Sequence, residues 1–374
     1  MKNFHRSIGR VRRATAAGFS LVEVMISVGI MTVIMAATMT ALSQAMKANE
    51  TAVLVTGMNN SLRTAMDLMI RDLLQVGSGL PPGHFILIPS NSQMNMPGPP
   101  LTPAVTYKSV VGDLDINAVN PGYGLGPVVS GIATDMITTL AADSTFTHVA
   151  LKSLATDGTI VVDPAVDIST GPDKVMPGQL IMLEKGSYSV LMQVTAIDGP
   201  ARRITFGTSP QDSLNLNKPN APSGSVNGAA GLIAWPTSPD TVPIAPALFL
   251  TTTATRIRMI SYYIDNTKPA HPKLVRRINN GNPTSFDNTS GSTVAFDVDN
   301  LQISYDIANG TSTLANQRCA PLTCSVNQIR KVNITLGARS RSVYSVTRQF
   351  FHNTLTTQVS LRGMAFVNEY APPI

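Results

Sequence analysis

The chain of 374 residues is short of the side chains on which most enzyme active sites depend. Histidine occurs five times, at positions that fit no common metal-ligand spacing. Glutamate occurs four times, at Glu23, Glu50, Glu184 and Glu369, so a glycosidase-like carboxylate pair would need scattered aspartates. The sequence also lacks a nucleophile elbow, a phosphate-binding loop and a kinase pattern. We therefore expect no enzymatic activity, no cofactor and no metal site.

Charge is also scarce, since Asp, Glu, Lys and Arg make up 13% of the residues and the net charge is +6. The excess lies in the first 18 residues, which contain no acid and five cations, Lys2, Arg6, Arg10, Arg12 and Arg13. Without these five, 23 of the 28 cations remain against 22 acids, a net charge of +1. The rest of the chain therefore lacks the strongly basic surface that binding of nucleic acids requires, so we expect no direct nucleic-acid partner.

What the sequence does contain is a long apolar run from Phe19 to Met46, interrupted by one charge, Glu23. A helix of this length, at about 1.5 Å per residue, exceeds the roughly 30 Å hydrocarbon layer of a membrane. A secretory signal would have a shorter apolar region with its cleavage site after it. The basic leader, residues 1–18, should stay cytoplasmic, because positive flanks remain inside. We therefore expect residues 19–46 to cross the membrane.

Glu23 is informative because an ionised carboxylate in hydrocarbon needs a cation beside it. The string GFSLVEV at residues 18–24 resembles the type IV prepilin signature. The resemblance implies that prepilin peptidase cleaves after Gly18 and that Phe19 becomes the N-methylated first residue. It also implies that Glu23 pairs with the Phe19 amine of a neighbouring subunit and so sets the register between subunits. A plain single-pass anchor, whose first helical turn tolerates an acid, is the alternative.

Beyond the apolar run, the spacing of apolar residues predicts that the helix continues. Such residues recur every three or four positions between Leu54 and Val76, the pattern of an amphipathic helix. Glycines and prolines from Gly77 onward supply the stop. We therefore expect one helix over residues 19–76, with residues 47–80 as an amphipathic continuation that packs against a globular domain.

The sequence pattern of residues 81–374 predicts a β-rich domain. Together with the helix, this domain predicts a pilin-like α+β fold, in which a long N-terminal helix packs on an antiparallel sheet. Residues 81–134 and 208–247 are rich in Pro, Gly, Ser and Asn and should form long loops. Asp297 and Asp299 alternate on one predicted strand, which favours a solvated face over an acid–base pair. The strand-like runs are 135–140, 146–151, 179–184, 189–197, 203–207, 256–264, 273–278, 294–307, 329–336 and 354–361.

Four segments resemble the PilW family of minor pilins and its relative, the type II secretion pseudopilin J. They are the helix end at 63–80, a hairpin at 178–194, paired strands at 258–279 and a closing sheet at 294–336. The resemblance implies a non-enzymatic minor pilin that helps to initiate a type IV pilus. Its partners would be prepilin peptidase, the major pilin, other minor pilins and the inner-membrane assembly platform. Before assembly it would be a single-pass inner-membrane protein with a periplasmic C-terminal domain.

Cysteine is limited to Cys319 and Cys324. A turn can close this spacing into a disulfide in an oxidising periplasm, whereas zinc would need two further ligands. We therefore expect a disulfide.

Two other functions stay open at the level of the sequence. A type II secretion pseudopilin would belong to a short periplasmic pseudopilus instead of a surface filament. A membrane-anchored adhesin or binding protein would recognise its ligand through the Pro/Gly/Asn-rich loops and would work without Glu23.

Overall fold

The computed structural model divides the chain into two compact units, Met1–Val53 and Leu54–Ile374. We describe each unit by itself. The residues described are 18–81, 86–88, 93–95, 98–99, 106–108, 115–154, 159–185, 188–207, 212–217, 252–279, 291–308, 313–319 and 328–364.

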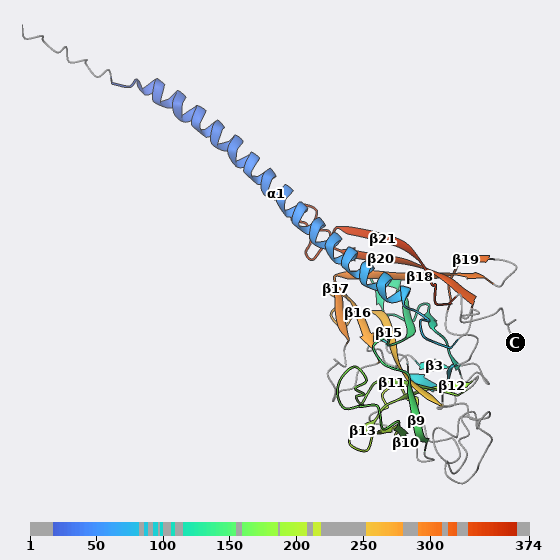
Figure 1. The fold of residues 1–374 in the computed structure, drawn as a ribbon. Coiled ribbons are helices and arrows are strands. Elements are labelled where there is room, and N and C mark those ends of the chain that lie inside the picture. The colour runs from blue at the N-terminus through green and yellow to red at the C-terminus, as the bar shows by residue number, and fades with distance from the viewer. Residues whose placement is uncertain are drawn as a thin grey trace, which may run out of the picture. The chain divides into compact units, whose positions relative to one another are not determined.

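A single helix, α1 (Leu21–Leu74), begins in the first unit and ends in the second (Figure 1). Ser20 caps its start: the Ser20 hydroxyl accepts a hydrogen bond from the Val22 N–H at 3.3 Å, and the Ser20 carbonyl accepts one from the Val24 N–H. The expectation of one long helix is confirmed, with each end two residues inside the predicted bounds.

The larger of the two main sheets has thirteen strands among the described residues. Their bounds are β1 (Ile86–Leu87), β4 (Asp115–Ile116), β5 (Val119–Gly122), β8 (Met136–Ala142), β9 (Val149–Leu154), β10 (Thr159–Val162), β11 (Leu180–Lys185), β12 (Tyr188–Gln193), β13 (Ala196–Asp198), β14 (Arg203–Thr205), β15 (Thr253–Asp265), β16 (Lys273–Ile278) and β17 (Ser292–Phe296). The main order is β13-β14-β10-β9-β15-β11-β12-β1-β4. The long strand β15 also pairs with β8 and β16, and these pair in turn with β5 and β17. Every pair is antiparallel except β1 with β12.

The second sheet has four antiparallel strands in the order β19-β18-β20-β21. Their bounds are β18 (Val298–Ala308), β19 (Thr313–Gln317), β20 (Ile329–Arg339) and β21 (His352–Ser360). Figure 1 shows β18, β20 and β21 side by side. Two small ribbons pair β2 (Gln93–Asn95) with β3 (Thr106–Lys108) and β6 (Val128–Val129) with β7 (Ile132–Ala133).

The main core lies where the second half of α1 meets the two sheets. The buried face of the helix supplies Met58, Leu62, Ala65, Met66, Met69 and Leu73. These side chains share one apolar cluster with Tyr262 of β15, Leu274 of β16 and Ile334 of β20. The spacing of three and four residues along the helix therefore does what the sequence predicted: it places one apolar stripe against the β-rich domain. A smaller second cluster fills the space among β9 to β12 and β14.

The glycine-rich exit of the helix is held by close backbone contacts. Gly77 has φ of +75° and donates its N–H to the Leu140 carbonyl at 3.0 Å. A β-carbon on Gly363, in the turn after β21, would lie 2.2 Å from the carbonyl oxygen of Val76. Only glycine allows the two segments to approach this closely, so the exit is a packed junction as well as a helix stop.

The structure confirms most predicted strands and corrects two expectations. The run at 294–307 is two strands, because Asp297 has a left-handed φ of +60° between β17 and β18. Residues 81–134 contain the short strands β1 to β7, where only loops were expected. Among these, β5 includes Pro121, which is tolerated because β8 is the one strand that pairs with β5 among the described residues, so β5 lies at a sheet edge. Of residues 208–247, only 212–217 are described, and their leucines are buried.

Candidate functional site

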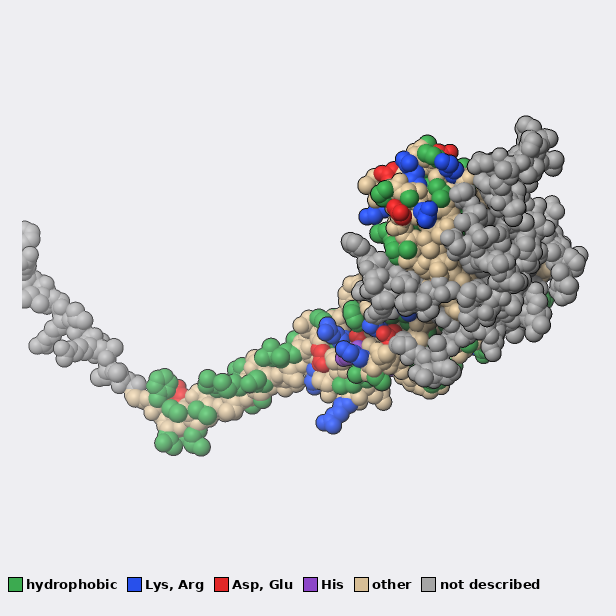
Figure 2. Space-filling view, turned by 90° about the horizontal axis from the view of Figure 1, so that it is seen from below, with side chains coloured by type: hydrophobic (Ala, Val, Ile, Leu, Met, Phe, Trp, Pro, Cys, Tyr) green, Lys and Arg blue, Asp and Glu red, His purple; other side chains and the backbone are tan. Residues whose placement is uncertain are grey.

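The most distinctive surface of the chain is the first half of α1. Between Leu21 and Val53 its large apolar side chains are exposed, and in Figure 2 hydrophobic side chains cover much of this part of the helix. The helix is long and apolar enough to cross a membrane, and no residue of its most apolar 18-residue window is buried. This surface can lie in lipid or against similar helices, since either environment removes it from water.

Four hydroxyl side chains along the same stretch form hydrogen bonds within the helix. Ser27, Thr32, Thr38 and Thr40 donate their hydroxyl protons to carbonyls three or four residues earlier, at 2.8 to 2.9 Å. A hydroxyl bonded inside its own helix adds no unsatisfied donor in an apolar environment. Glu23 is thus the only charged group between Phe19 and Met46.

The three predicted processing and assembly residues lie together at the start of this helix. Gly18 and Phe19 precede it, and the Phe19 side chain is 80% exposed. Glu23 lies in the first turn of α1, is exposed, and forms no ion pair with any cation in the described ranges. Their roles in cleavage, methylation and subunit pairing stay predictions.

A buried polar cluster fastens the other end of α1 to β15 and β16. The Asp72 carboxylate accepts hydrogen bonds from the Tyr262 hydroxyl at 2.5 Å and from Nε and Nη2 of Arg276 at 2.6 and 3.1 Å. Strand register explains the meeting, because Tyr262 and Arg276 are directly opposite each other. Burial and the bond to Asp72 raise the pKa of Tyr262. Burial alone would lower the pKa of Arg276, but its bonds and attraction to Asp72 raise it.

Asp72 was not among the residues predicted from the sequence, although one signal was present. Asp72 follows the fully buried Met69 by three residues, a spacing that puts both side chains on one helix face. An acid on the buried face of an amphipathic helix requires a cation from the opposing sheet. Which cation it is could not be read from the sequence, since Arg276 is 204 residues away.

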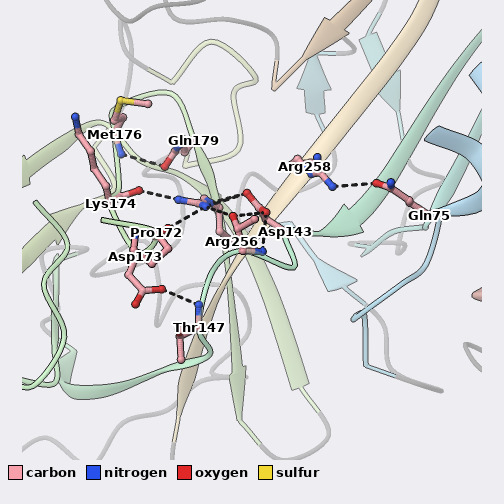
Figure 3. A network of polar contacts seen from close by, with 11 residues as sticks. Gln75, Asp143, Thr147, Pro172, Asp173, Lys174, Met176, Gln179, Arg256 and Arg258 are labelled. Carbon is pink, nitrogen blue, oxygen red and sulfur yellow. Dashed lines mark hydrogen bonds and ion pairs between the residues drawn. The ribbon is translucent and has the colours of Figure 1, made fainter. Parts of the chain in front are cut away.

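A second polar cluster, shown in Figure 3, connects loops that lie beside β15. Arg256 pairs with Asp143, with its Nε 3.0 Å from the carboxylate, and donates to the Lys174 and Pro172 carbonyls at 2.7 and 3.2 Å. Burial would raise the pKa of Asp143, but hydrogen bonds from Thr145 and the charge of Arg256 lower it. All the partners are side chains or carbonyls of this domain, so the cluster holds loops in place.

A third buried group, Asp135, joins the two sheets. Its two carboxylate oxygens accept the N–H groups of Gly124 at 2.8 Å and of Ile303, on β18, at 2.7 Å. Burial raises the pKa of Asp135 despite these two bonds. The position of Asp135 immediately before β8 means that one carboxylate links the larger sheet to the four-stranded sheet.

The solvated face expected for Asp297 and Asp299 is wrong. Both are buried, and each bonds a partly exposed histidine: Asp297 bonds Nδ1 of His271 at 2.7 Å, and Asp299 bonds Nδ1 of His352 at 3.1 Å. The left-handed turn at Asp297 breaks the strand alternation on which the expectation rested. Within the described residues no group of three or more His, Cys, Asp or Glu side chains could hold a metal ion.

The predicted disulfide falls partly outside the described residues. Cys319 is fully buried, and its carbonyl accepts the Tyr123 N–H at 3.1 Å. Cys324 lies outside the described ranges, so its bond to Cys319 stays a prediction.

Comparison with known proteins places the N-terminus in a defined class. Residues 13–39 match the family described as the prokaryotic N-terminal methylation motif. This match and the apolar helix imply a type IV pilin or pseudopilin-like protein that serves as a structural subunit. They also imply processing by prepilin peptidase and assembly with other pilins. No curated protein and no solved structure matches the chain.

Proposed function

We propose that the protein is a minor pilin that helps to initiate and assemble a type IV pilus. The observation that carries the proposal is the prepilin-type motif on a helix whose first half exposes an apolar surface over its whole length. In the filament this surface packs against the corresponding helices of other subunits. The four sequence segments that resemble the PilW family support the minor-pilin role.

Processing and register follow from the first residues of the helix. Prepilin peptidase removes residues 1–18, and Phe19 becomes the N-methylated terminus. The new amine of Phe19 supplies the cation that a carboxylate in an apolar environment requires. Glu23 of one subunit and Phe19 of the next then form a pair shielded from water, and this pair fixes the axial register of assembly.

Before assembly the chain lies in the inner membrane, with residues 19–46 across the bilayer and the β-rich domain in the periplasm. The basic leader supports this orientation. The junctions at Asp72 and Gly77 join the second half of α1 to the sheets, so the β-rich domain moves together with that half of the helix.

Deletion of the gene and complementation tests the proposal. We expect the deletion to abolish surface filaments recovered by shearing, and the wild-type gene to restore them. Intact filaments with failed protein secretion would assign the chain to a pseudopilus of type II secretion instead. No change in either would contradict both and favour an anchored adhesin.

A further inference from the structure

Three exposed cations gather at one end of the sheets, on two neighbouring turns. Lys268 lies in the turn at 266–272, between β15 and β16, and Arg341 and Arg348 lie in the loop at 340–351, between β20 and β21. We call these three side chains the basic rim. No ion pair joins any of them to an acid within the part of the chain that the structure describes.

The two turns are held together by Arg339. Its Nη2 donates hydrogen bonds to the carbonyls of Pro269 and Ala270 at 2.7 and 2.8 Å. Its guanidinium also lies over the ring of Phe350, 4.8 Å from the centroid. The basic rim is therefore one patch on a fixed support.

Cations outnumber acids at this end of the sheets. Residues 307–368 contain no Asp or Glu. Asp265 pairs with Lys273, and Asp297 and Asp299 are buried and bonded to histidines that carry charge only when protonated. With neutral histidines, the three cations of the basic rim, Arg339 and Lys273 give five positive charges against these three negative charges, a net charge of +2.

The loop at 340–351 also exposes apolar side chains from an ordered backbone. Val343 and Val346 are 42% and 55% exposed. Hydrogen bonds from the Tyr344 N–H to the Gln349 carbonyl and from the Arg348 N–H to the Tyr344 carbonyl, at 2.9 and 2.8 Å, close the turn. Arg348 has φ of +54°, a conformation that favours glycine. The backbone conformation at position 348 would therefore be more stable with glycine, yet a cationic side chain occupies this position.

Two contacts show at which end of the globular unit the rim lies. Near the start of β21, the Asn353 side-chain amide donates to the Asn59 side-chain oxygen at 2.6 Å. After the end of β21, Gly363 packs on the carbonyl of Val76. Strand β21 thus runs in the same direction as α1, and the loop that precedes it lies at the end where the helix enters this unit.

We propose that the basic rim, with Val343 and Val346, binds the anionic phospholipid headgroups of the membrane that holds the first half of α1. Exposed cations next to small apolar side chains are the combination that binds a charged membrane surface. The inference rests on the proposed membrane insertion of residues 19–46. The chain enters the second unit from residues 19–46 at the same end of that unit where the loop lies.

The contact gives the subunit a preferred face toward the bilayer before assembly. Each cation near an anionic surface favours the bound state about fivefold, so three favour it about a hundredfold. Extraction of the subunit into a filament must break these contacts, and higher salt weakens them.

Hydrogen–deuterium exchange of the full chain in lipid vesicles tests the proposal. The wild type is compared in vesicles of phosphatidylcholine alone and of phosphatidylcholine with phosphatidylglycerol. The test variant carries Arg341→Gln and Arg348→Gly, because glycine suits the backbone at that position. The matched control carries Lys331→Gln and Arg362→Gln, two exposed cations at the other end of the four-stranded sheet.

We expect exchange in residues 341–348 to slow in the anionic vesicles only, and to recover at high salt. The control variant should show the same protection as the wild type. In the test variant, the equilibrium constant for the membrane-bound loop should fall about 25-fold, because two cations are removed. Equal exchange in both lipids, or unchanged protection in the test variant, would overturn the proposal. Equal protection by polyglutamate without vesicles would assign the rim to an acidic protein.

Vesicle flotation in the same samples separates this inference from the proposed function. A chain that floats with both lipids but shows no protected loop refutes only the basic rim as a lipid site. A chain that does not float with either lipid refutes the membrane insertion on which both proposals depend.

Discussion

Asp72→Asn should loosen the junction between α1 and the sheets. Asp72 is 7% exposed and the Arg276 side chain 18% exposed, so the guanidinium would stay largely buried without its counter-charge. Asparagine keeps the size of the side chain but replaces one acceptor oxygen by an NH2 group. This group is a donor, so it cannot accept the hydrogen bonds that Arg276 and Tyr262 donate. Breaking a buried pair on one side costs about 3–5 kcal/mol, and we expect about 3 kcal/mol here because Arg276 keeps some contact with water.

Urea unfolding of the detergent-solubilised chain, followed by the circular dichroism of the sheets, measures this cost. Asp67→Asn is the matched control, because Asp67 is exposed on the same helix and should change the free energy of unfolding by less than about 0.5 kcal/mol. The double variant Asp72→Asn with Arg276→Gln should recover part of the loss, since no buried charge is left unpaired. Equal stability of Asp72→Asn and Asp67→Asn would refute the reasoning.

Two further predictions concern packing and pH. Gly363→Ala should destabilise the helix exit by about 1–3 kcal/mol, because its β-carbon would meet the Val76 carbonyl, whereas Gly57→Ala, with open space around it, should be neutral or stabilising in the same unfolding assay. The lowered pKa of Asp143 stabilises the fold above its ordinary value of 3.8, and this stabilisation is lost as pH falls through the lower folded pKa. The stability difference between wild type and Asp143→Asn should therefore narrow from pH 6 to pH 3, and a difference that widens would contradict the assignment.

The helix and most strands could be predicted because their signals are local. The three-to-four spacing from Leu54 to Val76 and the β-branched runs reflect the two periods of regular structure. The break at Asp297 could not be predicted, since a left-handed residue other than glycine leaves little trace in the sequence. Strand β5 was missed because Pro121 argues against a strand unless its edge position is known.

The residues of the candidate site also differ in whether the sequence alone could reveal them. The prepilin-type start at Gly18, Phe19 and Glu23 is a contiguous motif, and it was found from the sequence. The junction of Asp72 with Arg276 depends on the pairing of β15 with β16, and the basic rim depends on two turns that Arg339 brings together. Such sites are set by tertiary contacts between distant segments, and composition or spacing cannot reveal them.

We propose that Glu23 acts in assembly and not in processing. The test uses a strain that lacks the gene and is complemented with the wild type or with Glu23→Ala. The amount of cleaved chain in the membrane is compared with the amount of chain in sheared filaments. We expect Glu23→Ala to be cleaved after Gly18 but to be largely missing from filaments, because the pair with Phe19 is lost. Normal incorporation of the cleaved variant would show that Glu23 has no role in assembly.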